Sequence, residues 1–173
     1  MKKNLVLTGM MGVGKSTIGK KLAKNLQRKF VDIDEIIETK EKKTIKEIFE
    51  NEGEHYFRKI EKKITHEELK KDNLIIALGG GAFINTSIRR EIKSSCLSFW
   101  LDLKVESLLI RLKNIKKRPL LDEDKLKKSI NKIYSERKKI YNESNFRIKC
   151  NAMNKDEIVY KIIELYENAK NKL

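Results

Sequence analysis

The sequence is poor in the residues that build linkers, metal cages and membrane spans. Its 173 residues include one proline and two cysteines. A single proline leaves no proline-rich linker. Neither Cys96 nor Cys150 has a Cys or His at metal-ligand spacing, so we expect both to be reduced core thiols. No apolar run approaches the ~18–20 residues that span a bilayer, and the apolar run after Met1 is too short for a signal peptide. We expect a cytoplasmic chain with no membrane partner.

Negative charge is also scarce: 25 acidic residues stand against 40 basic ones, for a net charge of +15. Of the basic residues 32 are lysine and eight are arginine, and the lysines are spread along every expected helix. A single basic stripe would indicate nucleic-acid binding, whereas this spread is typical of a solvated surface. We expect no nucleic-acid partner and a field that attracts small polyanionic substrates. The length fits one domain, residues 1–173, and the lack of a long apolar surface stripe favours a monomer.

Short apolar strands alternate with amphipathic helices along the chain. The expected strands are 4–8, 30–33, 73–78, 96–101 and 146–150, and the expected helices are 15–28, 44–51, 53–71, 86–93, 105–112, 125–141 and 155–169. Thr44 followed by Glu47 forms a capping box, and residues 114–124 form a basic loop. Such alternation predicts a three-layer α/β/α fold with a five-stranded parallel sheet and helices on both faces.

The segment 9–16, GMMGVGKS, matches the phosphate-binding pattern G-x-x-x-x-G-K-[ST] between a strand and a helix. Its glycines allow backbone N–H groups to curl around phosphate oxygens. Lys15 adds a charge at the β- and γ-phosphates, and the Ser16 hydroxyl is a ligand for Mg²⁺. The expected nucleotide-binding residues are Gly12, Val13, Gly14, Lys15, Ser16 and Thr17. We predict a nucleoside triphosphate as co-substrate, with Mg²⁺. A GTPase is disfavoured because the chain lacks D-x-x-G.

Two carboxylates, Asp32 and Asp34, follow the second strand. Period-two spacing in a strand predicts that they share one face, at the carboxyl edge of the sheet where α/β proteins bind ligands. One of the pair can hold hydrated Mg²⁺, and the other can hydrogen-bond, and deprotonate, an acceptor hydroxyl. The alternative is that Asp34 only caps the next helix.

Two further clusters favour an acidic acceptor. Arg58 and Glu61 lie three residues apart on a helix, so that the carboxylate can orient a guanidinium fork, which matches a carboxylate bidentately. The alternative is a surface ion pair. The triple glycine Gly79, Gly80 and Gly81 closes the third strand and lets a ligand approach the backbone.

Three more arginines extend the pattern. The basic loop, taken as 113–124, is typical of a lid over phosphates, and within it Arg118 can stabilise the transferring phosphoryl group. Arg137 can grip an anionic acceptor. Arg111 can stack on adenine or be a solvated helix residue.

The whole set of motifs resembles the shikimate kinase family. The resemblance rests on G-x-x-G-x-G-K-S at 9–16, D-x-D at 32–34, G-E-x-x-F-R-x-x-E at 53–61, the glycines at 79–81, R-P-L-L at 118–121 and Arg137 in Y-x-x-R-x-x-x-Y. It implies a nucleoside-monophosphate-kinase-like fold, a P-loop at 9–16, an acceptor-binding segment at 33–61 and a lid at 113–124.

The resemblance also implies roles for single residues. Asp34 engages the shikimate hydroxyls, Arg58 and Arg137 bind the shikimate carboxylate, and Lys15 and Arg118 contact the transferring phosphate. Gly79, Gly80 and Gly81 line the acceptor with backbone, Phe49 and Phe57 wall the pocket, and Ser16 and Asp32 hold Mg²⁺. The catalytic set is therefore Lys15, Asp34 and Arg118.

One segment departs from this pattern, and two alternatives stay open. Residues 151–154 lack the Arg or Pro that packs on adenine in many members of the family, so purine selectivity there is open. A related kinase for gluconate or a nucleoside monophosphate would share the P-loop and lid but would not need the arginine pair. A P-loop protein acting on nucleic acid would use the +15 charge instead.

Overall fold

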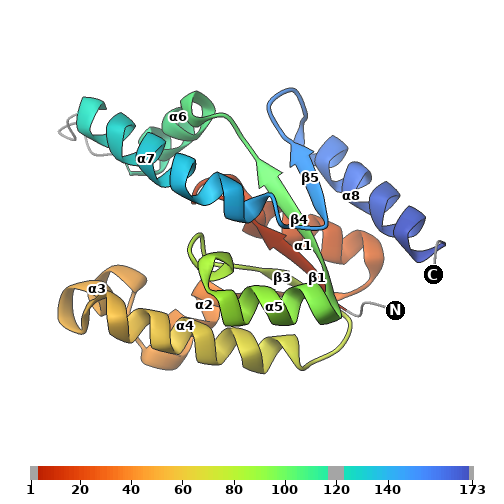
Figure 1. Cartoon of the computed structure of the whole chain (residues 1–173), viewed down its shortest axis with the longest axis horizontal. Coiled ribbons are helices and arrows are strands. Elements are labelled where there is room, and N and C mark those ends of the chain that lie inside the picture. Colours follow the sequence, from red (N-terminus) through yellow and green to blue (C-terminus); the bar gives the residue numbers. More distant parts are fainter. Residues whose placement is uncertain (1–3, 117–122, 172–173) are drawn as a thin grey trace.

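A computed structural model describes residues 4–116 and 123–171 (Figure 1). Five strands form one sheet in the order β2-β3-β1-β4-β5, and every neighbouring pair is parallel. The strands are β1 Asn4–Thr8, β2 Lys29–Asp32, β3 Leu74–Ala77, β4 Cys96–Asp102 and β5 Phe146–Lys149. The predicted five-stranded parallel sheet is thus confirmed.

Eight α-helices and one 3₁₀ turn connect and cover these strands in the described ranges. They are α1 Lys15–Leu26, α2 Ile33–Glu41, α3 Ile45–Asn51, α4 Gly53–Leu69, η1 Ala82–Ile84, α5 Thr86–Ser95, α6 Val105–Lys116, α7 Glu123–Tyr141 and α8 Lys155–Lys170. The right-handed rule for parallel crossovers puts α1, which leads to β2, and α5, which leads to β4, on opposite faces of the sheet. Helix α8 follows the last strand and packs on α1. In Figure 1, α2, α3 and α4 gather on one side of the strands' carboxyl ends, and α6 and α7 lie on the opposite side.

The sheet is apolar because both of its faces are covered. All residues of β1, β3 and β4 are buried, which is the pattern of a central parallel sheet. Leu5 of β1 lies in register with Ile75 of β3 and Leu97 of β4. The central strand β1 therefore has a neighbour on each side. The connection from β1 runs to β2 on one side, and the connection from its neighbour β3 runs past β1 to β4 on the other side. This reversal is where open α/β sheets bind ligands.

Helix α2 corrects the expectation for the second strand. The sequence pattern put residues 30–33 in a strand with Asp32 and Asp34 on one face, but β2 ends at Asp32 and Asp34 lies in the first turn of α2. Asp32 is the N-cap residue, and its carboxylate accepts the Asp34 N–H at 3.0 Å. The two acidic residues of the first turn, Asp34 and Glu35, also stabilise the helix through their interaction with the positive end of its dipole. Asp32, and not Asp34, is therefore the cap.

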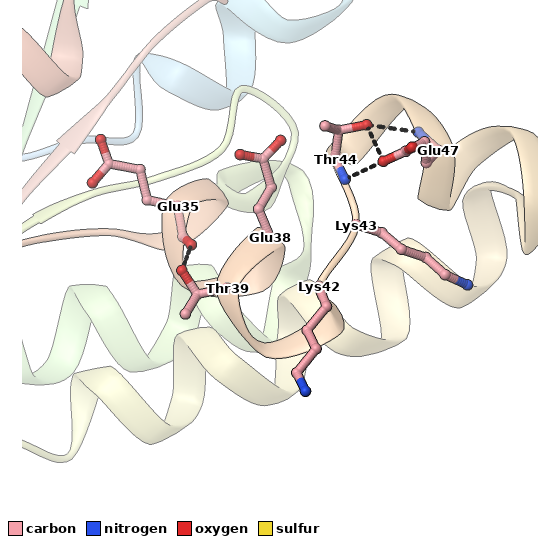
Figure 2. A pocket seen from close by; sticks show the side chains of 7 residues that line it. All are labelled: Glu35, Glu38, Thr39, Lys42, Lys43, Thr44 and Glu47. Carbon is pink, nitrogen blue, oxygen red and sulfur yellow. Dashed lines mark hydrogen bonds between the residues drawn. The ribbon is translucent and has the colours of Figure 1, made fainter.

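Other boundaries differ by smaller amounts. Helix α3 follows Thr44 with the predicted capping box, whose bonds to Glu47 are drawn in Figure 2. Both ends of the expected basic loop are helical, because residues 114–116 continue α6 and Glu123 begins α7. The turn η1 was not predicted. Within the described ranges, no helix has the length and apolarity of a transmembrane span.

Both cysteines are buried and neither forms a disulfide among the described residues, as predicted. Burial raises the pKa of the Cys150 thiol to about 12. A thiol in that state is a poor nucleophile at neutral pH, because the thiolate is the reactive form.

Candidate active site

The loop between β1 and α1 has the backbone of a phosphate cradle. Gly9, Gly12 and Gly14 have φ values of 135°, 76° and 102°, a region that favours glycine. A Cβ on Gly9 would lie 2.5 Å from the Leu101 carbonyl oxygen, so the loop can pass this close to β4 only with glycine there. Gly14 is the N-cap of α1 and has no side chain to accept the first-turn N–H groups. Those groups are left to bind an anion.

Lys15 lies against the same loop. Its Nζ donates to the carbonyl oxygens of Gly9 at 2.9 Å and Met10 at 3.0 Å. Burial lowers the pKa of Lys15 to about 8, and the nearby carboxylates of Asp34 and Asp32 limit that fall. Because Lys15 lies between the loop and two carboxylates, its ammonium group is positioned to bind the phosphate oxygens of a nucleotide.

Ser16 and Asp32 meet at the start of α1 and the end of β2. The Ser16 hydroxyl donates to Asp32 Oδ2 at 2.5 Å, and Asp32 is 8% exposed. In the described ranges, no group of three or more His, Cys, Asp and Glu could form a metal cage. This donor set fits Mg²⁺, which keeps most of its waters and is commonly bound by one or two carboxylates and by substrate phosphates.

The triple glycine is where the predicted acceptor residues meet. A Cβ on Gly79 would lie 2.7 Å from Asp34 Oδ1, one on Gly81 would lie 2.6 Å from Arg58 Nη1, and one on Gly80 would lie 3.6 Å from Arg137 Nη1. A carboxylate and two guanidinium groups are thus gathered along three residues, or about 7 Å of backbone. The side chains come from α2, α4 and α7, three elements far apart in the sequence.

Asp34 and Glu61 form an acidic pair at Gly79. Asp34 Oδ1 and Glu61 Oε1 are buried and have no hydrogen-bond partner among the described residues. Burial, followed by the charges of Asp32 and Glu61, raises the pKa of Asp34 to about 6. Burial also raises the pKa of Glu61, although the guanidinium of Arg58 opposes this. A carboxylate with a pKa near 6 and an unused acceptor oxygen can take a proton from a bound hydroxyl.

Arg137 and Tyr141 hold the backbone of the glycine turn from α7. Arg137 Nη1 donates to the Gly80 carbonyl oxygen at 2.9 Å, and the Tyr141 hydroxyl donates to the same oxygen. The two residues are four apart and so lie on one face of the helix. This contact ties α7 to the end of β3. Tyr141 was expected only as the last position of the motif Y-x-x-R-x-x-x-Y and had no predicted role. Its spacing of four residues from Arg137 is the signal that predicts this shared contact.

The rings of Phe57 and Phe49 pack against each other beside Arg58, with their planes tilted by 40°. Their ring centroids are 4.7 Å apart, and the Arg58 guanidinium carbon lies 5.1 Å from the Phe57 ring centroid. Phe57 is 4% exposed and Phe49 is 37% exposed. Phe57 therefore supports the arginine from within the core, and Phe49 is available as an apolar wall.

A cavity of about 760 Å³ lies beside the P-loop, and its lining does not include Asp34, Arg58 or Arg137. Its lining includes Gly12, Val13, Gly14 and Thr17 from the predicted nucleotide set, and Arg111, Met153 and Asn154. Arg111 Nη1 donates to the Val13 carbonyl oxygen at 2.8 Å, which ties α6 to the loop. The Asn154 side chain caps α8. Stacking of Arg111 on adenine stays a prediction. Met153 belongs to the segment 151–154, which lacks the Arg or Pro that packs on adenine in many members of the family.

A second depression, of about 560 Å³, opens beside α2 and the turn before α3. Figure 2 shows Glu35 and Glu38 on α2 and the Thr44–Glu47 capping box at its other end. None of the predicted site residues lines it. Its charges are mixed, and we assign it no role.

Two predictions lie outside the described residues. One is the role of Arg118, and the other is the lid at 113–124, half of which is the segment 117–122. Both remain predictions.

We expect Gly79→Ala to damage the acceptor site specifically. Its Cβ would lie 2.5 Å from Glu61 Oε1 and 2.7 Å from Asp34 Oδ1, so both carboxylates must move. Overpacking of this kind costs about 1–3 kcal/mol. We expect this cost to fall on the acceptor complex, so that kcat/KM for the acceptor falls about 5- to 150-fold. The KM for ATP is the internal control and should stay near its original value, because Gly79 does not line the cavity beside the P-loop. A rise in the KM for ATP as large as the rise for the acceptor, measured by steady-state kinetics, would contradict the assignment.

The P-loop and the glycine turn leave the neighbouring parallel strands β1 and β3 at one edge of the sheet. A triphosphate bound at the loop would therefore point toward an acceptor bound at the turn. Fold and site together define a P-loop kinase that acts on a small acceptor. Within this class, the family model for shikimate kinase matches residues 11–167, which is most of the chain. The chain belongs to the shikimate kinase family.

Individual relatives agree with this membership. A shikimate kinase from Sulfurihydrogenibium sp. is 42% identical over 161 residues, which cover 93% of this chain and 96% of the relative. A solved structure of shikimate kinase from Acinetobacter baumannii in complex with shikimate has a TM-score of 0.90 at 34% identity, covering 98% of this chain and 96% of the other. A gluconokinase from Sinorhizobium meliloti is similar in fold only, with a TM-score of 0.61 at 15% identity and coverage of 99% of this chain and 97% of the other.

Proposed function

We propose that the chain transfers the γ-phosphoryl group of ATP to the 3-hydroxyl of shikimate, giving shikimate 3-phosphate and ADP. Family membership supports the reaction, and the shikimate in the Acinetobacter baumannii structure supports the acceptor. The observation that carries the proposal is the meeting of Asp34, Arg58 and Arg137 at Gly79–Gly81. A cyclic acid with several hydroxyls needs an arginine clamp at its carboxylate and a carboxylate at its hydroxyls, and these residues supply both.

The acceptor is held from both ends. Arg58 and Arg137 bind its carboxylate with planar N–H forks. The Gly80 backbone, with no Cβ, lets the ring approach the turn, and Phe49 and Phe57 limit the space on its apolar side. Holding the acceptor oxygen in line with the γ-phosphorus accounts for much of the rate, because phosphoryl transfer depends on positioning and charge neutralisation.

Asp34 receives the proton in the chemical step. The acceptor oxygen forms a bond to the γ-phosphorus as the bond from that phosphorus to the β–γ bridging oxygen breaks, and the hydroxyl proton passes to Asp34. The leaving ADP keeps the bridging oxygen and its electron pair. Lys15 neutralises the charge that develops on the phosphate oxygens, and the P-loop N–H groups hold the β-phosphate. Arg118 is proposed to add a second cation at the γ-phosphoryl group.

Ser16 and Asp32 are the residues that would hold Mg²⁺, since their hydroxyl and carboxylate oxygens meet beside the P-loop. The ion supplies positive charge to the phosphate oxygens when bound. We take residues 1–173 as one functional unit with its P-loop at 9–16, its acceptor segment at 33–61 and its lid at 113–124. The monomeric state and cytoplasmic location stay predictions, and size-exclusion chromatography with light scattering checks the first.

The first experiment is an ADP-release assay with ATP and Mg²⁺ and four separate acceptors: shikimate, gluconate, AMP and single-stranded DNA. We expect release with shikimate alone. Release with gluconate or AMP would keep the P-loop chemistry but overturn the roles of Arg58 and Arg137. Tight, salt-sensitive binding of the DNA would instead support the alternative based on the +15 charge.

Arg58→Ala is expected to weaken acceptor binding more than turnover. A hydrogen bond to a charged group contributes about 1.5–3 kcal/mol, so KM for shikimate should rise about 10- to 150-fold while KM for ATP stays near its original value. Arg137→Lys should act in the same direction, because a lysine keeps the charge but lacks the planar fork. Steady-state kinetics with each substrate varied in turn checks both variants. An unchanged KM for shikimate in both would contradict the clamp.

A further inference from the structure

The guanidinium of Arg58 is held by two carboxylates of different character. Nη1 donates to Glu61 Oε2 at 2.7 Å, and the Glu61 side chain is 3% exposed. Nε and Nη2 both donate to Glu54 Oε1, at 3.2 Å and 3.1 Å, and the Glu54 side chain is 67% exposed. Glu61 is thus a buried, permanent partner, and Glu54 is a partner at the surface.

The bond to Glu54 takes the side fork of the guanidinium. A guanidinium binds a carboxylate best when two parallel N–H groups on one edge meet its oxygens, and Nε with Nη2 forms such an edge. A single oxygen of Glu54 now accepts from both atoms. An acceptor carboxylate that approaches this edge meets a carboxylate already in place.

Exposure decides which of the two carboxylates can leave. Removing Glu61 from Arg58 would leave a buried charge without a partner, which is costly. Glu54 can turn into water with little penalty, since an exposed ion pair contributes little free energy. Glu54 also lies in the first turn of α4, where its negative charge stabilises the helix N-terminus whether or not it contacts Arg58.

We propose that Glu54 occupies the acceptor-carboxylate position on Arg58 in the empty enzyme, and that it must be displaced for shikimate to bind. Glu54 is then a residue that sets acceptor affinity through competition, and Glu61 is the residue that orients Arg58. This inference rests on the proposed function, because it takes Arg58 as the ligand of the acceptor carboxylate. Tighter binding of acidic acceptors is the expected consequence of removing the Glu54 carboxylate.

Glu54→Gln tests the competition directly. We expect KM for shikimate, and its Kd measured by calorimetry without nucleotide, to fall about two- to five-fold, with the effect in KM and not in kcat. Glu54→Asp keeps an acid at the start of α4 but shortens the side chain by one methylene group, so KM should fall by a smaller factor. Glu164→Gln is the matched control: it makes the same charge change at the exposed Lys161–Glu164 pair of α8, and should leave KM as it is.

Salt provides a second measurement. An exposed ion pair is screened as ionic strength rises, so the ratio of Kd values between wild type and Glu54→Gln should approach one in high salt. A KM that is unchanged or higher in Glu54→Gln would overturn the inference, because Glu54 would then be inert or would hold Arg58 in position for the acceptor. Lack of turnover of shikimate by the wild-type chain would instead overturn the proposed function, so the two failures are distinguishable.

Discussion

Asparagine in place of Asp34 is expected to lower kcat by about 10²- to 10⁴-fold and, at the same time, to stabilise the protein above pH 6. The kinetic loss follows from the proposed role, since a positioned general base contributes a factor of this size. Asparagine keeps the shape of the side chain and can still accept a hydrogen bond, but it cannot take the proton. The ADP-release assay measures this part of the prediction.

The stability gain follows from the electrostatics of the folded protein. Burial and the charges of Asp32 and Glu61 raise the pKa of Asp34 from 3.8 to about 6. A carboxyl group with a raised pKa contributes stability that is fully present below about pH 4 and is lost as the pH rises through about 6. The ionised form therefore costs up to about 3 kcal/mol at neutral pH, from two pKa units at 1.36 kcal/mol each.

Urea denaturation of the metal-free protein at pH 5 and pH 8, with a chelator present, measures this cost. Wild type should lose stability between the two values relative to Asp34→Asn, and the variant should be the more stable at pH 8. Glu35→Gln is the control, because Glu35 is the next residue of α2 and its side chain is 59% exposed. A variant that is less stable than wild type at pH 8 would show that Asp34 contributes a net favourable contact.

Methionine in place of Lys15 is expected to abolish measurable turnover, with a loss in kcat of at least about 10³-fold. Lys15 donates to the P-loop carbonyl oxygens of Gly9 and Met10, and a group that stabilises developing charge in phosphoryl transfer contributes a factor of about 10³ or more. Methionine has a similar length and no charge. Stability should not fall, because the folded protein already disfavours the lysine cation.

The pKa of Lys15 also predicts an alkaline limb in the pH profile. Burial lowers this pKa to about 8 in the free protein. Because the pKa of Lys15 is lower in the folded protein than in the unfolded chain, Lys15 increases the free energy of unfolding as the pH rises from about 8 toward 10.5. Below about pH 8 this increase is absent. As the pH rises, the free enzyme also loses the cation that binds phosphate, so kcat/KM for ATP should fall above about pH 8. Lys20→Met, at an exposed position of α1, should keep this profile. A Lys15→Met protein that retained a tenth of its activity would contradict the role.

Short-range patterns were the reliable part of the sequence. The strand and helix on either side of the segment 9–14, the Thr44 capping box and the apolar runs of β1 and β4 depend on residues within a few positions of each other. The structure has these features where they were predicted, with β4 one residue longer. Arg58 and Glu61 were expected to pair because they are three residues apart on a helix, and their bond is 2.7 Å. The same rule applied four residues upstream would have found Glu54.

Errors arose where two local rules compete. The segment 32–34 satisfies both the alternation of a strand and the start of a helix, since Asp32 is an N-cap residue and Ile33, Ile36 and Ile37 have helical spacing. Alternation predicted that both carboxylates share a strand face. The helix is formed because the Asp32 carboxylate caps it and its apolar side packs on α4. Asp34 reaches the site from a helix turn.

The sequence by itself determined the class of chemistry, because a phosphate loop is a continuous segment whose glycines and lysine act together wherever the chain carries them. It also determined the sheet, since buried strands must alternate with helices that cover them. Only the tertiary structure decided how far apart the acceptor residues lie. Asp34, Arg58 and Arg137 are separated by 24 and 79 positions, and no local rule relates them. They meet at Gly79–Gly81 because the parallel strands end at one edge, and because a side chain on Gly79 or Gly81 would occupy the space that Asp34, Glu61 and Arg58 fill.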